Sequence, residues 1–360
     1  MSKVLFLCNI ELANPKRGTP IHVARLLREL RREHDLIVCA ASVPEDLSDV
    51  FVRYPQEKGL SKLCAMLRIA DTYKPRTIFT IGQVGLLAPV ILKYLCGVRI
   101  VVELQGVEYI EHYAAGHIGL FRYYFWKYKV WMLLFLYDSV IVMSKCGAIE
   151  YPGSGGWKIM YPAVDIDNVP QIEEYTSLPP LIVGYMGNTR GYQGLDYLIE
   201  AVVLARNRHL DVRMHLVLSG DSTEICSKIK SEGLTDVTKV LRNLQQHEAH
   251  REMLKTSVLV IPRPNVLEAV YGFPSKLPES LATGLPVIMT NVGPVAELMP
   301  ELGKHSIVIP TDDIPHRLAD ALQCVANMST LERKQRGDAA RVYARKFSWE
   351  TTARIVSDEL

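Results

Sequence analysis

The sequence predicts an α/β fold of two Rossmann-like domains that face each other across a cleft. Apolar segments of strand length alternate with helical segments along both halves of the 360-residue chain, and this alternation is typical of parallel sheets covered by helices. The alternation lapses between 161 and 180, where paired prolines and charged residues indicate a linker. A chain of this length also has enough residues to build two separate cores.

The first half begins with an expected strand at 3–8 and an expected helix at 20–33. Four apolar residues of this helix recur at the spacing that places them on one face, namely Val23, Leu26, Leu27 and Leu30. Further strands are expected at 36–40, 77–81, 100–104 and 140–143. After the linker, strands are expected at 182–186, 214–218, 237–241 and 258–261, and helices at 194–207, 222–231 and 247–255. We therefore expect domains over 1–170 and 171–344.

The composition is that of an ordinary globular protein, with 48% hydrophobic and 22% charged residues. A net charge of +2 without blocks of like charge gives no reason to expect nucleic acid as a partner. The seven cysteines form no Cys-x-x-Cys pair, which favours reduced thiols and no zinc site. No signal-peptide pattern precedes the first strand, so a cytoplasmic location is expected.

The first strand-to-helix loop, residues 9–19, excludes two common nucleotide sites. It contains Gly18 as its only glycine, so the Gly-x-Gly-x-x-Gly fingerprint is absent and a nicotinamide or flavin cofactor is disfavoured. A Gly-Lys-Ser/Thr loop is also absent from the sequence, which argues against a P-loop phosphotransferase. Asp165 and Asp167 have the spacing of a metal-binding pair, but they lie in the linker. No metal site and no cofactor are expected.

The segment 273–286 has the pattern of a helix that receives a phosphate. Ser275 is expected to be the N-cap, Pro278 falls in the first turn, and Gly284 ends the helix. Free amides of a first turn attract anions, and Lys276 adds a full positive charge there.

Other residues add to this pattern. Glu279 is placed to accept hydrogen bonds from a sugar diol. The apolar strand at 258–261 leads into Arg263, so strand, loop and helix together predict a ligand site. Each residue alone has an ordinary structural explanation, since acidic residues favour helix starts and lysines are usually solvated.

The segment Phe121–Tyr137 is unusual because nine aromatic residues share seventeen positions with Arg122, Lys127 and Lys129. Its uncharged part is too short to span a bilayer. Two interpretations stay open. An amphipathic helix in the membrane interface suits aromatic and basic residues. A helix buried on two sides, against the sheet and the other domain, accounts for the same composition.

Motifs along nearly the whole chain carry a resemblance to one known family. They are Gly18–Val23, Ser139–Ser144, Tyr161–Asp165, Tyr185–Gly187, Leu195–Ala201, Leu218–Asp221, Pro274–Val287 and Phe347–Glu350. On these segments, the chain resembles a retaining glycosyltransferase of the GT-B fold in family four (glycosyl transferases group 1). The last of these resembles the family's final helix, so a helix at about 345–360 is expected to return to the first domain.

The sequence also departs from the family pattern. The family places two glutamates with seven residues between them, and here Tyr271 stands where the first is expected while Glu279 is the second. Asn188 and Gln193 stand where the family has Arg and Lys, and Gln105 replaces its acceptor-domain His. Thr19 replaces the second glycine of the loop. Positive charge at Arg190, Arg263 and Lys276 could compensate for the lost cations.

The resemblance implies transfer of a sugar from a nucleoside diphosphate sugar to an acceptor hydroxyl, with retention of configuration. Expected catalytic residues are Lys276, Arg263 and Glu279. Expected substrate-binding residues are Gly18, Thr19, Gln105, Gly187, Asn188, Arg190, Ser275 and Leu277. The acceptor is expected to be a saccharide, free or lipid-linked, with peripheral membrane contact through Phe121–Tyr137. A nucleotide-sugar 2-epimerase and a catalytically weak sugar-nucleotide-binding partner subunit stay open as alternatives.

Overall fold

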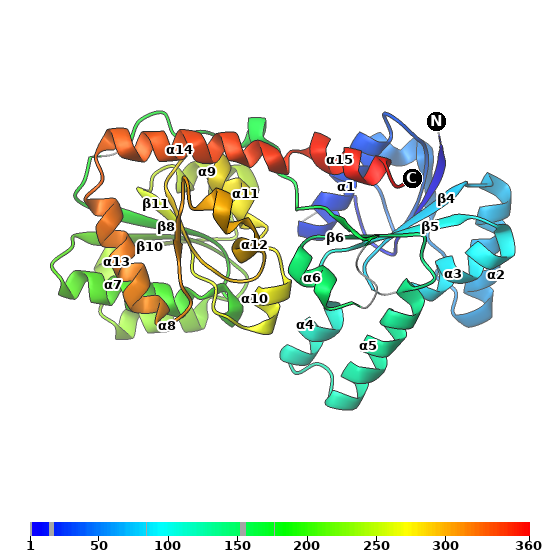
Figure 1. Ribbon diagram of the computed structural model, residues 1–360, viewed down its shortest axis with the longest axis horizontal. Helices are drawn as coiled ribbons and strands as arrows, with labels where there is room; N and C mark the ends of the chain where they lie inside the picture. Colours follow the sequence, from blue (N-terminus) through cyan, green and yellow to red (C-terminus); the bar gives the residue numbers. More distant parts are fainter. Residues whose placement is uncertain (1, 14–17, 84, 152–155, 176) are drawn as a thin grey trace. The chain divides into compact units, whose positions relative to one another are not determined.

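The structure is a computed structural model that describes residues 2–13, 18–83, 85–151, 156–175 and 177–360 (Figure 1). It divides into two compact units. Unit 1 comprises residues 1–163 and 349–360, and unit 2 comprises Val164–Ser348.

Unit 1 contains a seven-stranded parallel sheet in the order β3-β2-β1-β4-β5-β6-β7. The expected strands of the first half are present, and two short strands at the sheet edges, β3 and β7, were not expected from the sequence. The strands are β1 (Lys3–Leu7), β2 (Asp35–Ala40), β3 (Phe51–Arg53), β4 (Thr77–Ile81), β5 (Arg99–Leu104), β6 (Ser139–Val142) and β7 (Lys158–Ile159). The first strand therefore lies in the middle, and the chain adds neighbours to it on both sides.

Helices connect the strands of unit 1 and cover the sheet (Figure 1). They are α1 (Gly18–Leu30), α2 (Gly59–Tyr73), α3 (Leu87–Cys96), α4 (Glu108–Ala114), α5 (Leu120–Leu134), α6 (Lys145–Ile149) and α15 (Trp349–Ser357), with a 3-10 turn at Glu45–Val50. The buried apolar face of α1 packs on the sheet, as its periodicity predicts. Phe6 and Phe79 meet edge to face in the same core, with ring centroids 5.4 Å apart.

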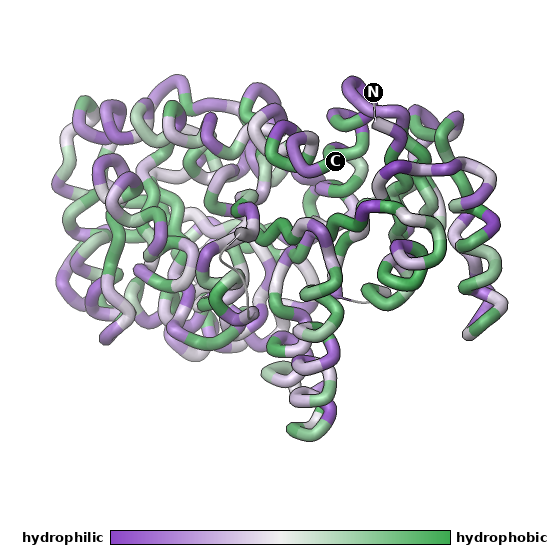
Figure 2. The backbone as a smooth tube through the Cα atoms, turned by 45° about the vertical axis from the view of Figure 1, so that its right-hand side comes forward, coloured by the Kyte–Doolittle hydropathy of each residue, from purple (hydrophilic) through white to green (hydrophobic). Residues whose placement is uncertain are grey.

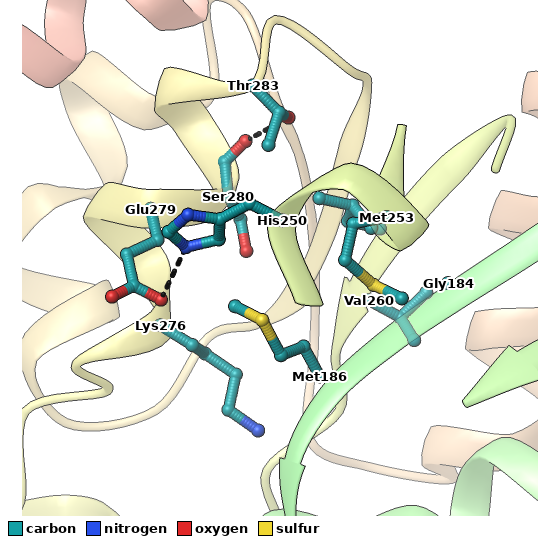
Figure 3. A pocket seen from close by; sticks show the side chains of 10 residues that line it. Gly184, Met186, His250, Met253, Val260, Lys276, Glu279, Ser280 and Thr283 are labelled. Carbon is teal, nitrogen blue, oxygen red and sulfur yellow. Dashed lines mark hydrogen bonds and ion pairs between the residues drawn. The ribbon is translucent and has the colours of Figure 1, made fainter. Parts of the chain in front are cut away.

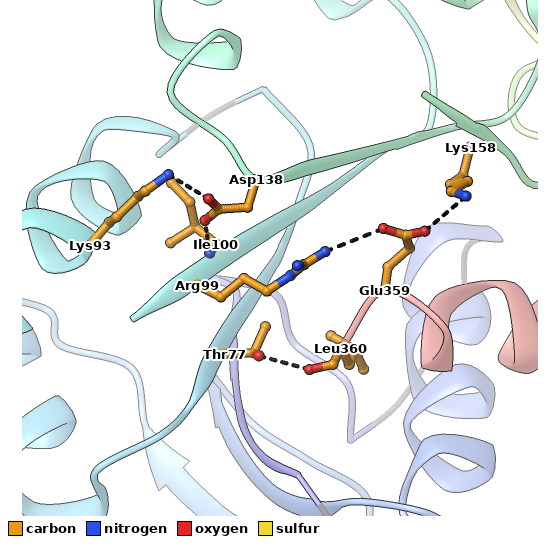
Figure 4. Close-up of polar contacts among 8 residues, drawn as sticks. All are labelled: Thr77, Lys93, Arg99, Ile100, Asp138, Lys158, Glu359 and Leu360. Carbon is orange, nitrogen blue, oxygen red and sulfur yellow. Dashed lines mark hydrogen bonds and ion pairs between the residues drawn. The ribbon is translucent and has the colours of Figure 1, made fainter. Parts of the chain in front are cut away.

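Residues 349–360 are an integral part of unit 1. Val356 of α15 is fully buried in the core that contains α1. Figure 4 shows Glu359 between two cations, 3.4 Å from Nη2 of Arg99 and 3.2 Å from Nζ of Lys158. The hydroxyl of Thr77 donates to the carbonyl of Leu360 at 2.9 Å. The chain thus returns to its first unit after completing the second.

Unit 2 contains a six-stranded parallel sheet in the order β10-β9-β8-β11-β12-β13. Its strands are β8 (Leu181–Asn188), β9 (Val212–Ser219), β10 (Thr238–Arg242), β11 (Val258–Ile261), β12 (Val287–Thr290) and β13 (Ile307–Ile309). Its helices are α7 (Leu195–Asn207), α8 (Thr223–Ser231), α9 (Gln246–Met253), α10 (Leu267–Tyr271), α11 (Lys276–Ala282), α12 (Pro294–Leu302), α13 (Ile314–Ala326) and α14 (Thr330–Ala344). The 3-10 turns are Ile166–Asn168, Gly191–Gln193, Thr235–Val237 and Arg345–Phe347.

Unit 2 begins at Val164, several residues before the expected boundary at 170/171. The reason lies in the contacts of the segment 164–172. Val164 forms a bridge with Ser348, and the guanidinium of Arg341 in α14 donates to the carbonyls of Ile166 and Val169. The same guanidinium donates to the carbonyl of Ala282 at the end of α11. The segment that we expected to be a linker is therefore fixed to unit 2 by backbone and side-chain hydrogen bonds.

Candidate functional site

The strand order of unit 2 indicates where a ligand would bind. The central strands β8 and β11 are neighbours, and the chain continues from β8 to β9 on one side and from β11 to β12 on the other. Open α/β sheets bind ligands outside the carboxyl ends of the strands at such a point. Gly187 and Asn188 end β8, Arg263 follows β11, and α11 carries Lys276. The structure thus brings the predicted residues of unit 2 to the predicted kind of site.

Lys276 is the most unusual cation of this site. Its Nζ atom is buried, has no hydrogen-bond partner among the described residues, and lies 3.9 Å from the ring centroid of Tyr185. Burial holds the pKa of this amine well below its usual range, and the nearby charge of Arg263 lowers it further. The carboxylate of Glu279 opposes this shift. A buried amine without a hydrogen-bonding acceptor is ready to bind an anion, because an anion would supply both the missing acceptor and the missing countercharge.

The end of β8 approaches this amine closely. Gly187 has a φ of +150°, and a Cβ atom on it would lie 2.7 Å from Nζ of Lys276 and 3.1 Å from Oη of Tyr185. Glycine therefore allows backbone and amine to come together. The hydroxyl of Tyr185 donates to the carbonyl of Asn188 at 2.7 Å and fixes the turn after the strand.

Glu279 is held by two side chains of α9. Its Oε1 accepts a hydrogen bond from Nε2 of Gln246 at 2.7 Å, and its Oε2 lies 3.4 Å from Nε2 of the buried His250. Figure 3 shows the imidazole of His250 directed at this carboxylate, with Lys276 and Met186 lining the same small pocket. Sequence reasoning missed Gln246 and His250, because nothing in the sequence indicates that α9 packs against α11. The carboxylate is thus fixed before any ligand binds.

Arg263 has a different environment from the one we expected. The side chain is buried, its Nη1 donates to the carbonyl of Gly272 at 2.6 Å, and its Nη2 donates to the carbonyl of Glu268 at 3.1 Å. The guanidinium also lies over the ring of Tyr192 at 5.3 Å. These contacts shape the loop between β11 and α11. Direct contact of Arg263 with a diphosphate stays a prediction.

Ser275 is the N-cap residue of α11, as expected, but its side chain does not cap the helix. Ser275 is exposed, has helical φ and ψ, and makes no side-chain capping bond. The turn begins one step earlier, because the amide of Leu277 donates to the carbonyl of Pro274 at 2.8 Å. Leu277 itself is a fully buried core residue, and its amide is not free to bind phosphate. The predicted anion site therefore rests on the buried amine of Lys276, because the first-turn amide of Leu277 is already bonded.

Asn188 and Gln193, which stand where the family has Arg and Lys, lie at or shortly after the carboxyl end of β8. Asn188 accepts a hydrogen bond from the amide of Arg190 at 3.1 Å through Oδ1. The side chain of Arg190 is exposed, and Gln193 is buried. Because its side chain is exposed, Arg190 can reorient toward a ligand at little cost. Its contact with substrate stays a prediction.

The predicted residues of unit 1 come together at the carboxyl end of β5. Oγ1 of Thr19 donates to Oε1 of Gln105 at 2.7 Å, and Nε2 of Gln105 donates to Oε1 of Glu103 at 2.9 Å. Gly18 is the first residue of α1, so Thr19 follows in its first turn. Glu103 and its neighbour His22 were missed. The available signal was a glutamate in the otherwise apolar end of a strand.

The described residues contain no group of three or more His, Cys, Asp or Glu side chains that could hold a metal ion. Oδ2 of Asp165 accepts a hydrogen bond from Asn168 at 2.6 Å. The seven cysteines, all of which lie in the described ranges, form no disulfide bond. Throughout the described ranges, we find no helix with the length and apolar character that crossing a bilayer requires.

The lowered pKa of Lys276 predicts proton uptake when a diphosphate binds. In the free protein, the amine loses its proton at an unusually low pH, and a bound diphosphate would favour the ammonium form and raise its pKa again. At a pH between the pKa of Lys276 in the free protein and its higher pKa in the complex, binding of UDP should therefore be accompanied by the uptake of as much as one proton. Calorimetry in buffers of different ionisation enthalpy measures this uptake. Lys276→Met should abolish the uptake, and an equal uptake in this variant would assign the proton to another group.

Solved glycosyltransferase structures resemble this chain over nearly its whole length. HepE of Anabaena in complex with UDP aligns with a TM-score of 0.77 at 17% identity, covering 99% of this chain and 98% of that one. Sucrose-phosphate synthase from Thermosynechococcus elongatus aligns with a TM-score of 0.74 at 16% identity, covering 99% and 97%. WaaG, a glycosyltransferase involved in lipopolysaccharide biosynthesis, aligns with a TM-score of 0.65 at 15% identity, covering 99% and 98%. The predicted fold class, two parallel α/β units of the GT-B type, is confirmed.

The sequence of unit 2 also matches a model of a protein family. Residues 180–327, which include every strand of unit 2, match the family model described as Glycosyl transferases group 1. This segment is therefore a group 1 glycosyltransferase domain. Among curated proteins, none matches the sequence.

Proposed function

We propose that this protein transfers a sugar from a nucleoside diphosphate sugar to an acceptor hydroxyl, with retention of configuration. The observation that carries the proposal is the buried, unpartnered amine of Lys276 at the central strand ends of a group 1 glycosyltransferase domain. Retention is supported by the resemblance to family four. The known complexes add support for the donor class, because HepE, which shares the fold, binds UDP-glucose.

Each residue has a role in this proposal. Lys276 stabilises the negative charge that develops on the departing diphosphate. Glu279, held by Gln246 and His250, accepts hydrogen bonds from the ribose hydroxyls. Arg263 contributes its charge and holds the loop in shape, and Arg190 moves toward the phosphates when they bind. Gly18, Thr19 and Gln105 of unit 1 bind a sugar of one of the two substrates. A resident cofactor or metal ion has no part in this scheme.

The nucleotide is identified by a thermal-shift screen against UDP, GDP, ADP and their sugars. A ligand at 100 times its Kd adds about 2.7 kcal/mol to the stability, so the correct nucleotide should raise the Tm clearly. Incubation with the selected sugar nucleotide and saccharide acceptors then tests transfer, and NMR of the product gives the anomeric configuration. Interconversion of the donor without transfer would indicate a 2-epimerase. Binding without either reaction would indicate a sugar-nucleotide-binding subunit, and no binding at all would refute the proposal.

The acceptor is proposed to be a saccharide carried on a lipid, reached by a protein that is cytoplasmic and peripheral on the membrane. The support comes from α5. One face of this helix, together with the residue that follows it, is lined by large apolar side chains exposed to solvent. These are Phe121, Tyr124, Phe125, Tyr128, Met132 and Phe135. Arg122 and Lys129 are exposed beside this apolar stripe, and α5 contains no acidic residue. Figure 2 shows hydrophobic residues along this projecting part of unit 1.

The opposite face of α5 is buried against unit 1 through Val130, Leu133 and Leu134. The structure thus gives the helix one buried face and one exposed apolar face flanked by cations. Such a face suits the interface of an anionic membrane, where aromatic rings lie at headgroup level and cations contact the lipid phosphates.

Replacing Phe121 and Phe125 with serine should abolish co-flotation of the protein with anionic liposomes. Both side chains are exposed, so the Tm should change little. The matched control is Leu60→Ser, which removes an exposed apolar side chain from α2 and should leave flotation unchanged. If the parent protein does not float, the acceptor is more simply a soluble saccharide and the membrane part of the proposal fails.

A further inference from the structure

A buried carboxylate lies at the carboxyl end of the unit 1 sheet. Glu103 of β5 is fully buried. Its Oε1 lies 2.8 Å from Nε2 of His22 and accepts a hydrogen bond from Gln105. Its Oε2 is buried and has no hydrogen-bond partner among the described residues. Half of this carboxylate thus orders two neighbouring side chains, and the other half has unused capacity to accept hydrogen bonds.

Stability does not explain why this strand contains a glutamate. Residues 100–102 of β5 are apolar and buried, and an apolar residue at 103 would continue this pattern. Removing a carboxylate from water is costly, and replacement of a buried ion pair by well-packed apolar residues is often neutral or stabilising. A glutamate at this position therefore offers no clear gain in stability over an apolar residue.

The neighbours of Glu103 form a connected polar cluster at the start of α1. Thr19 donates to Gln105, Gln105 donates to Glu103, and His22 faces Glu103 from one turn further along α1. The imidazole of His22 also lies against the ring of Trp349, with centroids 5.4 Å apart. Its orientation is thus fixed from two sides. Gln105 and Thr19 are more accessible to solvent than Glu103, so a ligand that approaches the cluster would contact them first.

We propose that Glu103 is a positioning residue that holds His22 and Gln105 to bind the hydroxyl groups of a neutral sugar ring. This inference rests on the proposed function and adds the chemistry of the sugar side. Nε2 of His22 lies 2.8 Å from the carboxylate, and in the tautomer that carries its proton on Nε2, Nδ1 is an acceptor for a hydroxyl proton. The amide of Gln105 and the hydroxyl of Thr19 add both donors and acceptors. A ring that carries a carboxylate or phosphate would be repelled by Glu103, whereas a neutral ring would not.

The test compares Glu103→Gln, which keeps shape and removes charge, with Thr77→Val at the opposite end of the same sheet. Thr77 is also buried and hydrogen-bonded, but it lies far along β4 from the cluster. We expect both variants to bind UDP like the parent protein. The probes for the sugar are UDP-glucose as donor and methyl glucoside as acceptor, with methyl glucuronide as the charged counterpart.

Glu103→Gln should weaken sugar recognition about ten- to hundredfold, the effect of losing a charge-assisted hydrogen bond, while Thr77→Val should not. A rise in the KM for UDP-glucose would place the donor sugar in the cluster. A fall in kcat/KM for methyl glucoside, with an unchanged KM for UDP-glucose, would place the acceptor sugar there. Either result supports the inference, and the parent protein should discriminate against methyl glucuronide.

A second variant separates recognition from folding. The double change His22→Leu and Glu103→Leu should leave the protein about as stable as the parent, since both polar partners are replaced by apolar groups, yet it should lose sugar recognition to the same extent. Unchanged kinetics for both sugars in Glu103→Gln, in a parent protein that transfers sugar, would overturn this inference and leave the proposed function intact. Failure of the parent protein to bind any nucleotide would instead refute the proposed function.

Discussion

Lys276→Ala is expected to reduce kcat/KM for the sugar nucleotide by about 10²–10³, the usual loss when one preorganised donor to a developing negative charge is removed. The effect should be large because the amine is buried beside the strand end and needs no reorganisation when the leaving group forms. Steady-state kinetics measure this loss, and calorimetry with UDP separates its binding component.

The matched control is Lys304→Ala, which removes an exposed lysine of the same unit. This variant should retain the parent activity and affinity. If Lys276→Ala binds UDP and turns over like the parent protein, the diphosphate site lies elsewhere. Glu279→Ala should weaken nucleoside binding as well, which tests the neighbouring residue independently.

Arg263→Ala should lower the free energy of unfolding by roughly 2–4 kcal/mol and reduce turnover at the same time. The variant leaves the carbonyls of Gly272 and Glu268 without their charged donor, and it empties a buried site. A guanidinium that served only to contact the diphosphate would affect turnover far more than stability. The buried position of the guanidinium changes this expectation, because the same contacts support the loop and the site.

Chemical denaturation and steady-state kinetics on the same samples measure the two effects of Arg263→Ala. The control is Arg190→Ala, whose side chain is exposed and whose loss should change stability by less than about 0.5 kcal/mol. An unchanged stability in Arg263→Ala, with strongly reduced turnover, would favour the original expectation of direct phosphate contact.

The fold could be predicted because its signals are local and repeated. A buried parallel strand is a short apolar run, and the expected runs at 77–81 and 258–261 match β4 and β11 residue for residue. The edge strands β3, β7 and β13 were missed because two or three residues are too few to produce a periodic pattern, and the four-residue strand β12 was not expected either. Their pairing depends on neighbours already in the sheet.

The candidate site was predictable in position and less so in its chemistry. Pro278 and Gly284 correctly predicted that a helix begins near Lys276 after the strand β11. The burial of Lys276, and the use of Arg263 to bind carbonyls, depend on packing between segments distant in sequence. The position of the N-cap at Ser275 was predicted correctly, but its side chain makes no capping bond, and the carbonyl of Pro274 takes the amide of Leu277 instead.

The return of α15 to unit 1 has a consequence for synthesis on the ribosome. Residues 349–360 are made only after the whole of unit 2 has been translated, so the face of α1 that covers Val356 stays open to solvent until then. An incomplete unit with uncovered apolar surface is prone to aggregate. The delay lasts as long as unit 2 takes to be translated, so slower elongation through residues 164–348 would lengthen the exposure, and a chaperone that covers α1 would act during this interval.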